Sequence, residues 1–237
     1  MPAMPAAQFR LSSTGSTNNF ARVDLFIKIC GITNLADAQA AVAAGADALG
    51  FMFYRPSKRF LEPAYAREII DQLPAQVAKV GVFVNPTEAE VRETIATTGI
   101  DTLQFHGEEA PEFCAGFRPL RIWKAFRLAD AESLRDVRFH AEADAWLLDS
   151  HVAGSHGGTG HTFDWDLAIA AKQLSRAVIL AGGLHPGNVA AAVTHVRPYG
   201  LDVSSGVESA PGKKDHAKID EFIRNARTAA QALTGPQ

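Results

Sequence analysis

The feature that most constrains the fold is a strict alternation, after residue 24, of short apolar runs with longer amphipathic segments. Eight runs of four to eight residues predict strands, and eight segments predict helices. One run, Val80–Val84, is apolar on both faces, as a strand covered by helices requires. The predicted strands are Leu25–Cys30, Ala48–Phe53, Val77–Val84, Thr102–Phe105, Arg121–Phe126, Ala145–Asp149, Ala177–Leu180 and Gly200–Val203. The predicted helices are Leu35–Ala44, Pro63–Gln72, Pro86–Thr97, Glu109–Ala115, Asp130–His140, Trp165–Gln173, Pro186–His195 and Asp215–Leu233.

Eight strand–helix units predict an α/β protein of the (β/α)8 TIM-barrel class, formed by residues 25–237 as a single domain. A doubly wound sheet is the main alternative. It usually has fewer strands and a G-x-G-x-x-G turn after the first one. Here the first strand runs into Cys30-Gly31-Ile32-Thr33, which does not fit that turn, so the barrel is favoured.

Residues 1–24 differ in composition from the rest of the chain. Met1 to Ala21 contains no acidic residue and is rich in serine, threonine and asparagine. We expect a disordered extension or a misassigned start codon. A targeting segment is the alternative, which the low arginine content and weak apolar face disfavour.

The composition excludes several classes of protein. Apolar residues make up 47% and charged residues 21% of the chain, which is ordinary for a globular protein. The net charge is −3 with no basic stripe, so no nucleic-acid partner is expected. No apolar stretch approaches the roughly 20 residues that span a bilayer. Two cysteines, Cys30 and Cys114, are too few for a disulfide framework, which favours a cytoplasmic location.

Candidate catalytic residues stand where predicted strands end, because a barrel builds its active site at that rim. Cys30 ends the first strand, and a thiol needs modest help to act as a base near neutrality. Asp149 ends the sixth strand, where apolar surroundings suit a carboxyl group to general-acid work. The alternatives are a packed apolar thiol and a helix cap or ion-pair partner. His106 and Asp202 share this ambiguity, and Cys114 is expected to be structural.

Glycine-containing turns follow the seventh and eighth strands at Gly182-Gly183 and Ser204-Ser205-Gly206. Barrels often bind phosphate at these two positions. Ordinary strand–helix turns without a ligand would have the same sequence pattern. The loop Ser150–Phe163 contains four glycines and suggests a segment that covers the substrate. It also contains three histidines spaced five apart. That spacing fits no ligand pair, so no metal site is expected.

Matching stretches along the chain resemble the phosphoribosylanthranilate isomerase family of tryptophan biosynthesis. They run in the family's order from residue 25 to near residue 230. The stretches are Lys28–Thr33, Ser57–Arg59, Val80–Asn85, Gln104–Gly107, Leu147–Asp149, Gly157–Gly160, Phe163–Trp165, Gly182–Leu184, Pro186–Val189, Asp202–Glu208 and Pro211–Asp215.

The resemblance implies a reaction and roles for particular residues. N-(5-phosphoribosyl)anthranilate would become 1-(2-carboxyphenylamino)-1-deoxyribulose 5-phosphate by an Amadori rearrangement that uses neither cofactor nor metal. Asp149 would be the general acid on the ring oxygen, Cys30 the general base at C2, and Arg59 would lie near the anthranilate carboxylate. His106 and Asp202 would contact the substrate. The implied phosphate-binding residues are Gly158, Gly160, Gly182, Gly183, Ser204, Ser205 and Gly206. The expected partner is a small phosphosugar, and the expected assembly is a monomer or homodimer.

Other functions stay open at the level of sequence. An indole-glycerol-phosphate synthase-like lyase would need an essential lysine at a strand end, for which Lys124 is the candidate. A pentose-phosphate epimerase would need rim histidines and aspartates that hold a metal. A non-catalytic binder of phosphoribosyl ligands on the same barrel is a third possibility, which the joint presence of Cys30 and Asp149 disfavours.

Overall fold

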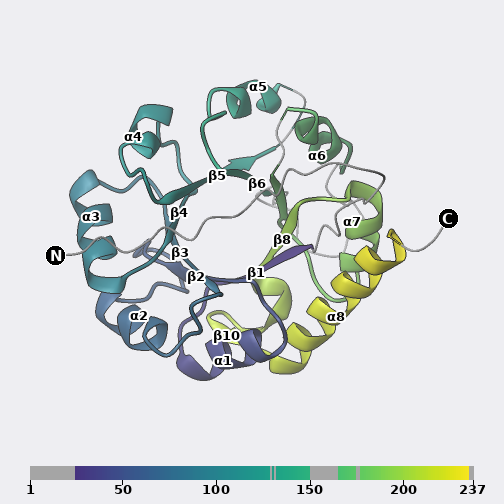
Figure 1. Ribbon diagram of the computed structural model, residues 1–237, viewed down its shortest axis with the longest axis horizontal. Coiled ribbons are helices and arrows are strands. Elements are labelled where there is room, and N and C mark those ends of the chain that lie inside the picture. The colour runs from purple at the N-terminus through teal and green to yellow at the C-terminus, as the bar shows by residue number, and fades with distance from the viewer. Residues whose placement is uncertain (1–24, 129, 131, 150–164, 175–176, 235–237) are drawn as a thin grey trace, which may run out of the picture.

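Eight parallel strands close into a barrel in the computed structural model, which describes residues 25–128, 130, 132–149, 165–174 and 177–234. Each strand pairs with its neighbours in sequence, and β8 pairs back onto β1 (Figure 1). The strands are β1 Phe26–Cys30, β2 Ala48–Met52, β3 Ala78–Phe83, β4 Thr102–Phe105, β5 Arg121–Arg127, β6 Ala145–Asp149, β7 Val178–Ala181 and β8 Gly200–Val203. The predicted single-domain (β/α)8 barrel is confirmed.

A ring of helices surrounds the strands (Figure 1). The helices are α1 Leu35–Ala43, α2 Pro63–Ile70, α3 Glu88–Thr98, α4 Pro111–Ala115, α5 Ser133–Arg138, α6 Trp165–Lys172, α7 Val189–Val196 and α8 His216–Ala232. The sequence placed the start of α3 two residues too early. Thr87 caps this helix by accepting from the Glu90 backbone N–H while the Glu90 carboxylate accepts from that of Thr87, so the helix begins at Glu88.

Alternation along each strand separates two apolar layers. In β1, Ile27 and Ile29 pack outward into the core shared with the helices, whereas Cys30 belongs to the cluster inside the barrel. In β6, Leu147 lies inside and Leu148 outside. Alternate residues share a face, so Asp149 is on the same side as Leu147 and points toward the barrel axis.

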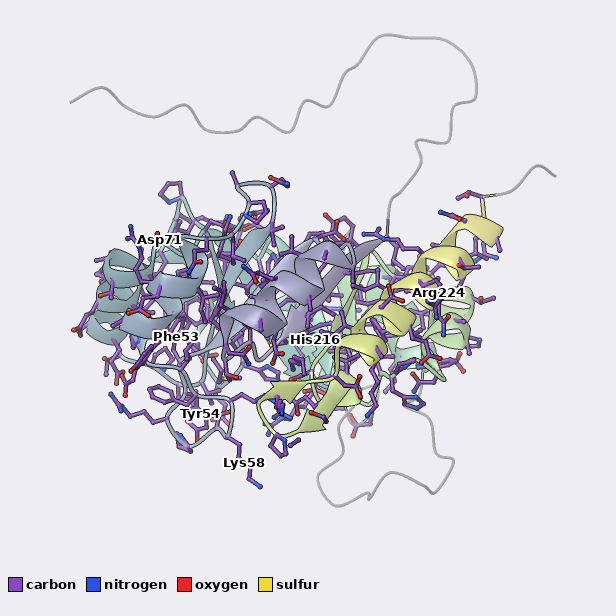
Figure 2. All side chains as sticks on the ribbon, turned by 90° about the horizontal axis from the view of Figure 1, so that it is seen from below. Phe53, Tyr54, Lys58, Asp71, His216 and Arg224 are labelled. Atoms are coloured by element: carbon purple, nitrogen blue, oxygen red, sulfur yellow. The ribbon has the colours of Figure 1, made fainter. Side chains whose placement is uncertain are left out.

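A short hairpin that the sequence did not predict follows β8. It consists of the 3₁₀ turn η1 Ser205–Val207 and the antiparallel strands β9 Glu208–Ala210 and β10 Lys213–Lys214. The hairpin lies at the same end of the molecule as Tyr54 and Lys58 of the loop after β2, and Asp71 at the end of α2 lies toward the opposite end (Figure 2). This end is therefore the C-terminal rim. No helix within the described ranges is long and apolar enough to cross a bilayer.

Candidate active site

Cys30 is the last residue of β1 and has only 6% of its surface exposed. It lies inside the barrel at its upper layer, where Gly31 turns the chain away with a φ of 77°. Burial raises the pKa of the Cys30 thiol, and the positive charge of Lys28 offsets only part of that rise. The sequence predicted that this thiol needs only modest help to act as a base near neutrality. Burial acts in the opposite direction, because it disfavours the thiolate.

Lys28 and Asp202 form an ion pair one layer below Cys30. The lysine Nζ lies 2.9 Å from the aspartate Oδ1, and the lysine side chain is fully buried. The two residues are register partners of β1 and β8, so the barrel itself holds them together. Burial alone would lower the pKa of Lys28, but Asp202 and Cys30 reverse this, and the lysine pKa lies above its ordinary value.

Arg59 reaches the rim from the loop after β2 and is held there by Glu208. Its Nε and Nη2 each donate to one carboxylate oxygen of Glu208 at 2.7 Å. Lys214 donates to the same carboxylate at 3.0 Å and to the Ser204 carbonyl at 3.2 Å. The Arg59 side chain lies directly over Gly31, where a Cβ would come within 2.5 Å of its Cδ. The structure thus brings Arg59 beside Cys30. Its Nη1 takes no part in the ion pair with Glu208.

His106 and Asp149 meet at another part of the rim. The His106 Nε2 lies 3.3 Å from the Asp149 Oδ2, and each side chain is 19% exposed. The Gln104 Nε2 lies 3.3 Å from the other ring nitrogen of His106, so donation from Gln104 leaves Nε2–H facing Asp149. A 3.3 Å contact is long for a charge-assisted hydrogen bond, so His106 itself holds the Asp149 carboxyl group only weakly.

The turns after β7 and β8 lie against each other. A Cβ on Gly206 would collide with the Leu184 carbonyl oxygen, so only glycine lets the two backbones approach this closely. Gly182 and Gly183 have φ values of 76° and 62°, and a Cβ on Gly183 would meet no heavy atom within 4 Å. The described part of the predicted phosphate site therefore lies on two turns that contact each other, with open space at Gly183.

Some predicted features lie outside the described residues. Gly158 and Gly160 do so, as do the whole substrate-covering loop, its three histidines and residues 1–24. Within the described ranges, no group of three or more His, Cys, Asp or Glu side chains is placed to hold a metal ion.

Lys124, the candidate lysine of the lyase alternative, points away from the barrel interior. Its neighbours Trp123 and Ala125 lie inside the barrel, so Lys124 faces the helices. Its Nζ lies 3.2 Å from Glu109 and donates to the Gly107 carbonyl at 2.6 Å. Both charged side chains are at most 3% exposed. The position of Lys124 thus argues against a catalytic role.

Sequence reasoning missed three charged residues of the site: Lys28, Glu208 and Lys214. The one available signal was in β1, where Lys28 stands between two isoleucines of an otherwise apolar strand. Alternation places such a lysine inside the barrel. No comparable signal marked Glu208 or Lys214, because their burial depends on the hairpin after β8.

Comparison with known proteins identifies the family. Residues 27–225 match the family model of N-(5'phosphoribosyl)anthranilate (PRA) isomerase. A relative from Pelobacter propionicus, named N-(5'-phosphoribosyl)anthranilate isomerase, is 52% identical over 208 residues, covering 88% of this chain and 98% of its own. The chain belongs to the phosphoribosylanthranilate isomerase family.

Solved phosphoribosylanthranilate isomerases share the fold. The enzyme from Thermotoga maritima is 42% identical, with a TM-score of 0.81 over 86% of this chain and 99% of its own. A second structure, 40% identical with a TM-score of 0.78 over the same shares, is a complex with reduced 1-(o-carboxyphenylamino)-1-deoxyribulose 5-phosphate. The range matched by the phosphoribosylanthranilate isomerase model spans both Cys30 and Asp149.

Proposed function

We propose that this chain is a phosphoribosylanthranilate isomerase of tryptophan biosynthesis, which converts N-(5-phosphoribosyl)anthranilate into 1-(2-carboxyphenylamino)-1-deoxyribulose 5-phosphate. The observation that carries the proposal is the pairing of a thiol and a carboxyl group on the inner side of one barrel rim, in a chain of this family. Cys30 ends β1 and Asp149 ends β6, with β8 and β7 between them in the ring. A sugar between these strands would meet one group on each side.

The proposed reaction divides two proton transfers between these groups. Asp149 gives its proton to the furanose ring oxygen, and the ring opens to a protonated Schiff base. That cation acidifies the C2–H bond, and the Cys30 thiolate removes the proton. The resulting enolamine takes up a proton at C1 and gives up its 2-hydroxyl proton, which yields the aminoketose. Because the ring C–O bond breaks on protonation and the other steps move protons within the substrate, no electrons are exchanged with an outside group, and the proposed mechanism uses no cofactor and no metal.

Substrate recognition is proposed to use the residues around these two groups. Arg59 is supported as the partner of the anthranilate carboxylate because Glu208 fixes the plane of its guanidinium group beside Cys30. The Nη1 group takes no part in the pair with Glu208 and is proposed to bind the substrate. His106 and Asp202 line the same inner side and are proposed to contact the sugar. The proposed phosphate-binding residues are Gly158, Gly160, Gly182, Gly183, Ser204, Ser205 and Gly206.

The proposed setting is the cytoplasm, where Cys30 and Cys114, which are both free, stay reduced. The proposed partner is the small phosphosugar substrate, and the assembly stays predicted as a monomer or a homodimer. The Thermotoga maritima enzyme is known as a dimer from which monomers have been generated.

Turnover of phosphoribosylanthranilate, followed by the loss of its fluorescence, tests the proposal. We expect Cys30→Ser and Asp149→Asn each to lower kcat about 10²- to 10⁴-fold, with a smaller effect on the affinity for a product analogue. Cys114→Ser is the matched control, because Cys114 is the other buried cysteine and lies in α4. It should turn over like the parent.

Three outcomes would contradict parts of the proposal. A Cys30→Ser variant within a few-fold of the parent would show that Cys30 is not the base. The same result for Asp149→Asn would move the acid role to another residue of the rim, with Asp202 the first to test. A parent that binds the product analogue without turnover would favour the non-catalytic binder.

A further inference from the structure

Lys28 and Cys30 lie side by side inside the barrel, above a glycine of the neighbouring strand. They are two residues apart on β1 and therefore face the same way. A Cβ on Gly50 of β2 would lie 2.8 Å from the Cys30 Sγ and 3.0 Å from the Lys28 Nζ. The absence of a side chain at Gly50 thus makes the space in which the sulfur and the amine meet.

A buried lysine at this place needs an explanation other than stability. The interior of such a barrel is usually filled by Val, Ile and Leu. A buried ion pair such as Lys28–Asp202 contributes little net stability, because desolvation offsets the attraction. An apolar pair of similar volume would fill the layer as well, so the charge of Lys28 calls for a role at the site.

Two other cations lie near the Cys30 sulfur, and they share one carboxylate. Arg59 and Lys214 both approach from above, and both are bound to the carboxylate of Glu208. From below, the Lys28 Nζ reaches the space over Gly50 in which the sulfur lies, and its charge affects the thiol more than that of its partner Asp202 does. Lys28 is therefore the cation best placed to act on the thiol.

We propose that Lys28 is a positioning residue whose ammonium group, fixed by Asp202 beside the Cys30 sulfur, favours the thiolate that takes the C2 proton. The proposal rests on Cys30 acting as the base. The charges act in opposite directions on the thiol. Burial raises the pKa of Cys30, Lys28 lowers it, and Asp202 raises it by a smaller amount. Removing Lys28 alone should therefore raise the thiol pKa most, and removing both charges should raise it less.

The rate of alkylation of Cys30 by iodoacetamide, measured from about pH 7 to about pH 10 by mass spectrometry of its peptide, tests this order. We compare the parent, Lys28→Met and the double variant Lys28→Met/Asp202→Asn. A neighbouring opposite charge shifts a pKa by about 1–3 units, so Lys28→Met should alkylate at least about tenfold more slowly at a given pH. The double variant, which leaves no unpaired buried carboxylate, should fall between it and the parent.

A matched control separates this effect from the general loss of a buried lysine. Lys79 of β3 is only 8% exposed and donates to the Pro74 carbonyl, away from Cys30. Lys79→Met should leave the pH dependence of Cys30 alkylation unchanged. Circular dichroism checks that each variant is folded.

A folded Lys28→Met variant with the alkylation profile of the parent overturns the proposal, as does a profile shifted toward lower pH. If Lys28→Met does not fold, the double variant is used in its place, and the same two profiles would overturn the proposal. The readout does not depend on turnover. A Cys30→Ser variant that retains activity would refute the base assignment, whereas the alkylation order would still report whether Lys28 controls the thiol.

Discussion

Replacing Lys124 by methionine tests whether the buried lysine of β5 serves the fold or the chemistry. The change removes the cation but leaves Glu109 buried at 2% side-chain exposure. Breaking a buried ion pair by removing one partner costs about 3–5 kcal/mol. In a chain of this size, each kcal/mol lowers Tm by about 2–4 °C. We therefore expect Tm to fall by about 6–20 °C in differential scanning calorimetry.

Arg121→Met is the matched control on the same strand. Arg121 pairs with Asp101 at 3.0 Å, but the two side chains are 49% and 38% exposed. Exposed pairs contribute about 0–1 kcal/mol, so Tm should fall by less than about 4 °C. The double variant Lys124→Met/Glu109→Gln should recover part of the loss, because no buried carboxylate then remains without its cation.

The refuting result is a Lys124→Met variant with the Tm of the parent and a kcat lowered by about 100-fold or more, a loss of the size that a catalytic group produces. It would mean that Lys124 acts on the substrate, and the lyase alternative would return. We expect the opposite: kcat/KM close to that of the parent at temperatures where the variant is folded.

Two further predictions concern the rim. Gly183→Leu should raise KM more than it lowers kcat, because its side chain would enter the proposed phosphate site. Gly99→Leu, which imposes the same strain at a φ of 71° in equally open space, should leave KM unchanged; equal KM values would place the phosphate elsewhere. Burial opposes ionisation of Glu208, but hydrogen bonds from Arg59 and Lys214 outweigh it, so its pKa lies below its usual range. Its stabilising contribution is thus present above about pH 4.3 and lost as the pH falls through the lower folded value. The deficit in unfolding free energy of Glu208→Gln, measured in urea, should shrink on acidification, and a constant deficit would contradict this.

The sequence predicted the barrel because its strands are buried on both faces. A strand such as β3, in which all six residues are buried and all but Lys79 are apolar or glycine, leaves a run that few other structures produce. Cys30 and Asp149 were predicted as site residues from the same signal, since each stands at the end of such a strand. The boundary of α3 was misplaced because a proline suggested the first turn, whereas the Thr87 cap decides it.

The charged contacts of the site could not be predicted in the same way. The pair of Arg59 with Glu208 joins residues 149 positions apart, and no local pattern specifies it. The strands β9 and β10 have three and two residues, too short for periodicity to show. Lys28 was readable in principle from its apolar neighbours, but its contact with Asp202 follows from the closure of β8 onto β1.

The hairpin after β8 limits how this barrel can be rebuilt from parts. Besides holding Arg59 of the second loop through Glu208, it accepts a hydrogen bond from Thr33 of the first loop at the Gly212 carbonyl. Three loops that are separate in sequence therefore form one mechanical unit. A graft that exchanges only the eighth loop for that of another barrel would remove Glu208 and leave Arg59 without its carboxylate partner. Loops one, two and eight should be transferable only together, whereas a loop that shares no side-chain contact with its neighbours can be exchanged singly.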